Sequence, residues 1–243
     1  MAATRTTERE PLSRDRVLAA AAALADAEGL PAVTMRRLAA DLGVEAMSLY
    51  HHLPGKGGLL DGLVETVIVE IEAELAQSRP ATEDTDGTDG TDWRDDVRRR
   101  CLSARTVMVR HPWAPGLISS RPTIPPAAYG YYEALLGSMI RGGLTYHLGH
   151  RALHSLGSMA LGFAQEVFSP ADSGGDLDPE AAEAEFAAMA EVLPYMAAMA
   201  AAEMHDADDP TLGWCDSQSE FEFTLDLILD GLARANESPT QAR

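Results

Sequence analysis

Residues 34–56 have the sequence TMRRLAADLGVEAMSLYHHLPGK, which predicts two short helices joined by a tight turn. Thr34 can cap the first helix, because a threonine hydroxyl accepts a free backbone N–H at a helix start. Gly43 is expected to end it, since glycine readily takes the left-handed conformation at a helix C-terminus. A second helix is predicted near residues 45–53, and a Pro-Gly pair stops it. The pattern is that of a helix-turn-helix.

The side chains of the second predicted helix favour a surface that contacts DNA. Leu49 and Leu53 are four residues apart and are expected to face inward. Hydroxyl, phenol and imidazole groups are left for the other faces, and such donors suit phosphates and base edges. An αα-hairpin in an ordinary helical protein has the same two helices and glycine turn, so this pattern alone leaves both interpretations open.

Length and composition are those of a globular protein, and the helical patterns along the chain predict an all-α fold. With 243 residues it can hold one or two domains with a sizeable core. No apolar run approaches the ~20 residues that span a membrane, and the N-terminus lacks an apolar secretory region. We therefore expect a cytoplasmic protein with no membrane partner. Two cysteines form neither a disulfide framework nor a zinc-binding spacing.

The charge of the chain is unevenly distributed. The formal net charge is −19, which is unusual for a DNA-binding protein. Residues 1–60, however, hold seven basic and seven acidic residues, and the other 12 basic and 31 acidic residues carry the whole excess. The acidic part is therefore expected to lie away from any DNA surface and to limit non-specific binding.

The remainder of the chain is predicted to be largely helical. Apolar periodicity indicates helices over residues 56–77, 93–110, 129–141, 145–168, 179–205 and 217–235, with a break at Pro194 and a proline-rich irregular stretch over 113–126. The acidic, Gly- and Thr-rich residues 79–92 predict a flexible loop. The last helix is apolar on more than one face, so it needs two partners, its own core and another subunit.

The N-terminal segments VLAAAAALADAEGL, VTMRRLAADLGV and SLYHHLPGKGGLLDGL resemble the DNA-binding domain of the tetracycline-repressor (TetR) family. Later segments, among them SRPTIPPAAYGYYEALL and FEFTLDLILDGLARA, extend a weaker resemblance over nearly the whole chain. The layout is closest to that of the tetracycline-binding members. The resemblance implies a three-helix DNA-binding domain over residues 11–60 and a larger helical domain for ligand binding and dimerisation over residues 61–236.

The resemblance also implies which residues contact DNA. They lie at the start of the first helix of the pair, along the second helix and just after it: Thr34, Arg36, Ala46, Met47, Ser48, Tyr50, His51, His52 and Lys56. Three positions depart from the tetracycline-binding members, because Ala46 replaces a base-reading glutamine, Met47 a proline and His51 a tryptophan. A lost bidentate amide contact is worth about 1–3 kcal/mol of base discrimination, so the operator is expected to differ.

The ligand site departs further from that of the tetracycline-binding members. Those proteins hold the drug and magnesium through a histidine that precedes an Arg-Pro pair, and here Leu117 falls at the histidine position. Other drug-binding positions fall at Glu72, Arg100 and Ala104, and only Glu166 matches an acidic neighbour of the metal. We predict no binding of magnesium-tetracycline and no cofactor. A small apolar or aromatic effector is expected among Met108, Trp113, Leu117, Tyr132, Met139, Phe163 and Glu166.

These implied features predict a ligand-responsive repressor that binds a palindromic operator as a homodimer and is released by its effector. Its recognition helices would enter successive major grooves roughly 34–36 Å apart, and residues 145–168 and 217–235 would form the dimer. The alternative is a helical protein that sequesters a small molecule without binding DNA, which the neutral first domain and Ala46 favour. No nucleophile–base or paired-carboxylate motif is present, so no enzyme is expected.

Three histidines on one predicted helix leave a question open. His150 and His154 are four residues apart, so they share a helical face and could hold a metal ion. Histidines of a core or an interface with hydrogen-bond partners are the favoured interpretation of this spacing. His147 lies close by, but no acidic or cysteine ligand does, and we assign no metal.

Overall fold

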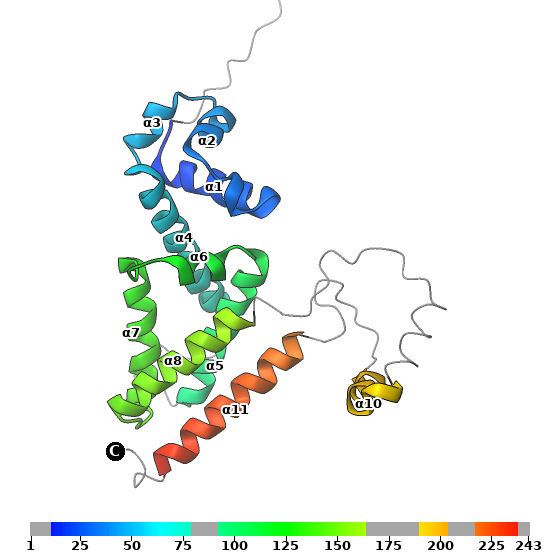
Figure 1. The fold of residues 1–243 in the computed structure, drawn as a ribbon. Coiled ribbons are helices and arrows are strands. Elements are labelled where there is room, and N and C mark those ends of the chain that lie inside the picture. Colours follow the sequence, from blue (N-terminus) through cyan, green and yellow to red (C-terminus); the bar gives the residue numbers. More distant parts are fainter. Residues whose placement is uncertain (1–10, 79–91, 164–189, 204–216, 238–243) are drawn as a thin grey trace, which may run out of the picture. The chain divides into compact units, whose positions relative to one another are not determined.

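The computed structural model describes residues 11–78, 92–163, 190–203 and 217–237, and every regular element within these ranges is a helix (Figure 1). The helices are α1 (Arg14–Glu28), α2 (Met35–Leu42), α3 (Ala46–Tyr50), α4 (Gly55–Gln77), α5 (Trp93–Arg110), α6 (Ala114–Ser120), α7 (Pro126–Arg141), α8 (Tyr146–Gly162), α10 (Pro194–Glu203) and α11 (Ser217–Glu237), with a short 3₁₀ turn at Leu30–Ala32. The predicted all-α class is confirmed.

The chain divides into two compact units. The first holds α1–α8 together with the residues from Leu232 onward, and the second comprises residues 165–231, which include α10 and most of α11. No helix of the described ranges is long and apolar enough to cross a membrane.

Helices α1–α3 and the first half of α4 enclose the first core. Ser13 caps α1, with its hydroxyl accepting from the backbone N–H of Arg16, and Gly29 follows the helix at φ 79°. Fully buried leucines from α2, α3 and α4 meet valine and alanine side chains of α1 in this core: Val17, Ala21, Leu38, Leu49, Leu59 and Leu63. The predicted N-terminal helices therefore form one packed unit.

The long helix α4 belongs to two cores. Leu59 and Leu63 lie in the first core, whereas Val67 and Ile71 pack with Ala104, Val107 and Met108 of α5 in a second. Helix α4 also contacts α6 and α7, and α7 packs on α5 and α8. A displacement of α4 would therefore change the packing of both cores.

One predicted segment differs from the structure, and another lies almost entirely outside the described residues. The stretch over residues 113–126, expected to be irregular, contains helix α6, which has a proline at its second residue, where a missing N–H is tolerated. The expected acidic loop over residues 79–92 lies outside the described residues except for Asp92. That residue caps α5, with its carboxylate accepting from the backbone N–H of Arg94.

Helix α11 presents two apolar faces, as the sequence predicts. Phe221, Leu225 and Leu229 are buried, whereas Phe223 and Leu227 are 60% and 53% exposed. The predicted boundary at Pro194 is also present, as the first residue of α10. Residues 164–168 of the expected dimerisation helix lie outside the described ranges.

Candidate functional site

The turn between α2 and α3 has the geometry of a helix-turn-helix. The Thr34 hydroxyl accepts from the backbone N–H of Arg37 at 3.2 Å and so caps α2. Gly43 follows α2 in the left-handed conformation (φ 65°, ψ 40°). The Val44 N–H then donates to the Ala39 carbonyl at 2.9 Å and ties the turn to α2. This turn fixes α3 against α2.

Helix α3 has one buried and one exposed face. Leu49 is fully buried, and Leu53, just beyond the helix, is 1% exposed. Met47 and Tyr50 are 67% and 49% exposed, although both are large and apolar or aromatic. Met47 and Tyr50 are three residues apart on this helix, so they lie on neighbouring positions of its exposed face.

The expected DNA contacts are accessible to different degrees. Six of them are exposed, namely Thr34, Arg36, Met47, Tyr50, His51 and Lys56, and three are half-buried, namely Ala46, Ser48 and His52. Arg37 differs from its neighbour Arg36, because its guanidinium binds Glu28 at 2.7 Å and Asp41 at 3.0 Å. The carboxylates of Glu28 and Asp41 raise the pKa of Arg37. Arg37 therefore stays charged, and its guanidinium is already paired with these two carboxylates.

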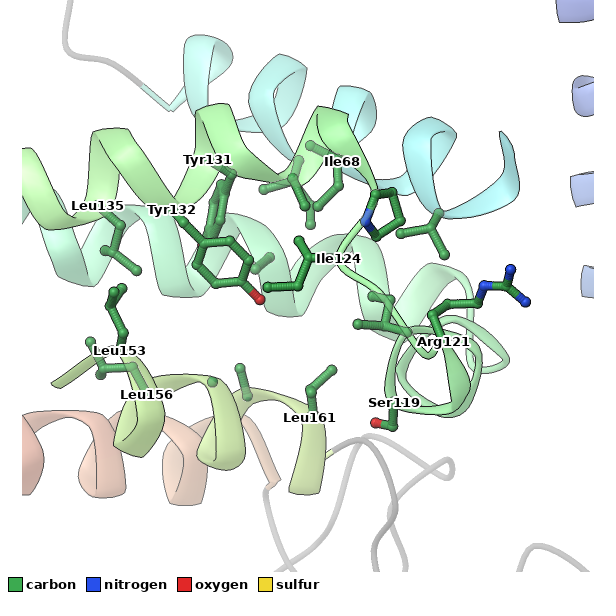
Figure 2. A pocket seen from close by; sticks show the side chains of 18 of the residues that line it. Ile68, Ser119, Arg121, Ile124, Tyr131, Tyr132, Leu135, Leu153, Leu156 and Leu161 are labelled. Carbon is green, nitrogen blue, oxygen red and sulfur yellow. The ribbon is translucent and has the colours of Figure 1, made fainter. Parts of the chain in front are cut away.

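A cavity of about 310 Å³ lies among α4, α5, α7, α8 and the segment from α6 to α7 (Figure 2). Its walls are mainly apolar and include Ile68 and Ile71 of α4, Ala104 and Met108 of α5, Tyr132 and Leu135 of α7, and Leu153, Leu156 and Leu161 of α8. In Figure 2, these leucines of α8 face Tyr131, Tyr132 and Leu135 across the cavity. Its size and lining are typical of small-molecule sites.

Of the side chains predicted to hold an effector, Met108 and Tyr132 line this cavity. Trp113, Leu117, Met139 and Phe163 do not belong to its lining, and Glu166 lies outside the described residues. Because 113–126 contains a helix, adjacent residues of α6 face different ways. Leu117 is 2% exposed and packs into the first core, whereas Ile118 and Ser119 reach the cavity.

The sequence reasoning missed much of the wall between α6 and α7. Thr123, Ile124 and Pro125 line the cavity, next to the Arg-Pro pair that had been recognised only as a landmark. It also missed the α8 side of the cavity. The spacing of Leu153, Leu156 and Ala160 on one face of α8 was a signal that could have identified that side.

The described wall of the cavity offers few charges. Arg121 belongs to the lining, but its Nε and Nη2 bind Oδ1 of Asp61 at 2.8 and 2.6 Å, and in Figure 2 the guanidinium points away from the cavity. Burial raises the pKa of the Cys101 thiol to about 12, so this group stays protonated. Burial likewise raises the pKa of Tyr131, whose hydroxyl donates to the Arg100 carbonyl at 3.3 Å. Such a wall favours an uncharged ligand.

The three histidines of α8 are all exposed. The rings of His150 and His154 lie edge to face with centroids 4.6 Å apart, so they share one face of the helix as expected. Within the described ranges, no group of three or more His, Cys, Asp and Glu side chains could hold a metal ion.

Two family models match the chain. One, described as bacterial regulatory proteins of the tetR family, matches residues 17–63. The other, described as the tetracyclin repressor-like C-terminal domain, matches residues 86–235, which are more than half of the chain. The first model covers most of α1, all of α2 and α3 and the start of α4, and the second covers α5–α8, whereas the part of α4 that lines the cavity lies between the two matches.

Curated relatives share part of their length with this chain. The HTH-type transcriptional repressor DrrR1 of Streptomyces coeruleorubidus is 37% identical over 134 residues, which are 55% of this chain and 46% of DrrR1. The tetracycline repressor protein class D of Escherichia coli is 31% identical over 157 residues, 64% of this chain and 66% of that protein. The chain thus spans about half the length of DrrR1 and about two thirds of the class D protein.

Solved structures share the fold over nearly the whole chain. Apo ActR from Streptomyces coelicolor matches with a TM-score of 0.68 and 25% identity, covering 95% of this chain and 99% of ActR. ActR in complex with actinorhodin matches with a TM-score of 0.66 and 24% identity, covering 93% and 97% of the two chains. At 24% identity, this second likeness concerns the fold alone.

Proposed function

The chain belongs to the TetR family, and from this membership we propose that it is a ligand-responsive repressor that binds a palindromic operator as a homodimer. The observation that carries the proposal is the two-faced helix α3. Its leucine is buried against α1 and α2, and Met47 and Tyr50 are exposed on a helix that a capped, glycine-containing turn holds in place. A helix presented in this way can enter a major groove with its exposed side chains toward the base edges.

Selection from random duplex DNA tests this proposal. The purified protein is expected to recover an inverted repeat whose half-sites are about one helical turn apart, because a two-fold dimer places two α3 helices on one side of the duplex. The operator should differ from that of the class D tetracycline repressor where Ala46 replaces glutamine. Failure to enrich any sequence at low salt would contradict the repressor and favour the sequestering protein.

Tyr50→Ala is the matched variant for this experiment. Half of the Tyr50 side chain is exposed, so its truncation is expected to leave folding and oligomeric state unchanged. The affinity for the selected operator should fall about 5–150-fold, which corresponds to about 1–3 kcal/mol for a lost base contact. If Tyr50→Ala dissociates the dimer instead, the side chain is structural and the assignment of α3 to the groove is wrong.

The cavity supports the effector half of the proposal. Val64, Ile68 and Ile71 of α4 line it, and the same helix begins five residues after α3. A ligand that contacts these side chains can therefore shift the helix that carries the DNA-binding surface. A coupling free energy of only about 1–3 kcal/mol changes operator affinity 5–150-fold. The uncharged walls favour an apolar or aromatic molecule, and the complex of ActR with actinorhodin supports a ligand-binding role for this fold.

We expect no magnesium-dependent binding of tetracycline. Leu117, which falls at the position of the metal-binding histidine, has no ligand atom and is packed into the first core. Glu72, which falls at another drug-binding position, is exposed rather than directed into the cavity lining. Titration calorimetry with tetracycline and Mg²⁺ tests this expectation, and micromolar or tighter binding that requires the metal would overturn it.

The homodimer is proposed to form through residues 145–168 and 217–235. The exposed Phe223 and Leu227 lie four residues apart on α11, so they form an apolar stripe that water contacts in the monomer. Leu227→Asp is expected to dissociate the dimer and to abolish operator binding. Sedimentation analysis measures the dissociation. Val69→Asp is the matched control, because Val69 is 64% exposed on α4, outside the proposed interface.

A further inference from the structure

His111 lies where α1, α4, α5 and α6 meet. It is the residue that ends α5, directly after Arg110, and its side chain is 7% exposed. Its Nδ1 lies 2.7 Å from Oδ1 of Asp26 on α1, and its Nε2 lies 2.9 Å from Oε2 of Glu70 on α4. One imidazole therefore joins α1, a helix of the first core, to the second half of α4.

Both carboxylates are held by further donors. The Trp113 Nε1–H, just before α6, donates to the same Asp26 oxygen at 2.6 Å, and the Trp113 ring lies 5.4 Å from the His111 ring. The Arg110 guanidinium binds Glu70 at 3.3 Å and Glu74 at 3.2 Å. The charged groups around the imidazole are thus three carboxylates and one guanidinium.

The two carboxylate contacts of His111 favour its protonated form. An ionised carboxylate only accepts hydrogen bonds, and a neutral imidazole has one N–H donor and one acceptor nitrogen. A neutral His111 can therefore donate to Asp26 or to Glu70, but its other nitrogen would then face a carboxylate oxygen without a proton between them. Only the imidazolium, with two N–H donors, satisfies both contacts.

We propose that His111 is a proton-dependent clamp, which fastens α1 and α4 to the end of α5 while it is protonated and releases one of the two carboxylates when it is not. The position at the end of α5 adds to this, because the C-terminus of a helix favours a positive charge. Helix α6 follows the clamp at Ala114 and reaches the cavity with Ile118 and Ser119. The clamp therefore adjoins the route between cavity and DNA surface, and this last point rests on the proposed function.

The electrostatic environment agrees with the geometry. Burial by itself lowers the pKa of His111, but its hydrogen bonds to Asp26 and Glu70 and the negative charges of these carboxylates outweigh burial and raise the pKa above the ordinary histidine value. A group with a raised pKa stabilises the folded state fully below its unfolded pKa of about 6.5, and this stabilisation is lost as the pH rises through the folded value. The clamp is accordingly closed in mildly acidic solution and opens toward alkaline pH.

Histidine-selective carbon NMR of the full chain tests the clamp without operator or effector, so its outcome is independent of the proposed function. His111→Gln identifies the signal among the seven histidines. That signal should titrate above the ordinary pKa, and Asp26→Asn or Glu70→Gln should each lower the midpoint by roughly one unit. Asparagine at position 26 keeps an acceptor for Trp113. Asp61→Asn, which removes the carboxylate that holds Arg121, is the matched control and should leave the midpoint unchanged.

Hydrogen exchange of α1 distinguishes a clamp from a buried histidine of purely structural importance. After correction for the intrinsic rate, protection of α1 should fall between pH 6 and pH 9 in the natural protein and should be independent of pH in His111→Gln. Asp26→Asn gives the same readout if His111→Gln does not fold. A His111 midpoint at or below the ordinary value, or equal pH dependence of α1 in both proteins, would overturn the proposal.

Discussion

The exposed surface of α3 comes from five consecutive residues, whereas the cavity walls come from elements spread between Val64 and Leu161. On α3, the local sequence decides which side chains are exposed, because the buried Leu49 fixes which face of the helix points inward. In the cavity, each wall residue depends on how a whole helix is rotated against its neighbours. The proposed DNA-binding surface on α3 is therefore specified by short-range rules, whereas the cavity lining depends on how several helices pack together.

The largest expected difference between the two regions is in how much stability each loses when a buried leucine is truncated to alanine. Leu49→Ala removes a fully buried side chain from the first core, and we expect a loss of about 2–5 kcal/mol in the free energy of unfolding. Leu135→Ala removes an equal volume, but Leu135 already borders the cavity and loses fewer neighbours. Its cost should lie at the lower end of that range. Denaturant unfolding of both variants measures the difference.

Equal or larger destabilisation by Leu135→Ala would contradict the comparison. It would mean that the cavity lining is as closely packed as the first core when the protein is unliganded. Met47→Ala serves as the control on α3, because the side chain is 67% exposed and its truncation should change stability by no more than about 0.5 kcal/mol.

The same contrast explains what the sequence could predict. The caps at Thr34 and Gly43 depend on residues within a few positions, and both were predicted correctly. So was α5, whose bounds match the predicted 93–110. Leu117 was expected at the effector site but lies in the first core. Helix α6 lies between two cores, and the local sequence does not determine which of its faces meets which core. The side chains that meet at His111 come from α1, α4 and the α5–α6 junction, far apart in sequence, and no periodicity links them.

The next expected effect is a stability change of opposite sign when a glycine in each region is replaced by alanine. Gly43 has φ 65°, so Gly43→Ala forces a left-handed conformation on a side chain and should destabilise by roughly 1–2 kcal/mol. Gly157 borders the cavity within α8, and a Cβ added there meets no atom within 4 Å. Gly157→Ala should therefore stabilise by roughly 0.5–1 kcal/mol, because alanine loses less conformational freedom in a helix. Thermal unfolding of both variants would reveal the opposite signs, and shifts of the same sign would refute the contrast.

The smallest expected effect concerns Lys56, the only lysine of the chain, which is exposed at the second residue of α4. A positive charge at a helix N-terminus is unfavourable by roughly 0.3–1 kcal/mol at low salt, so Lys56→Gln should leave stability unchanged or raise it slightly.

If Lys56 contacts a phosphate, the variant should also lower the slope of log affinity against log salt by about 0.9 per contact, and twice that for a dimer. Arg37→Gln is the matched control, because Glu28 and Asp41 already hold that guanidinium and the slope should not change. A slope that falls for Arg37→Gln but not for Lys56→Gln would move the phosphate contact from the start of α4 to α2, and the DNA-binding surface would then extend beyond the residues that local sequence specifies.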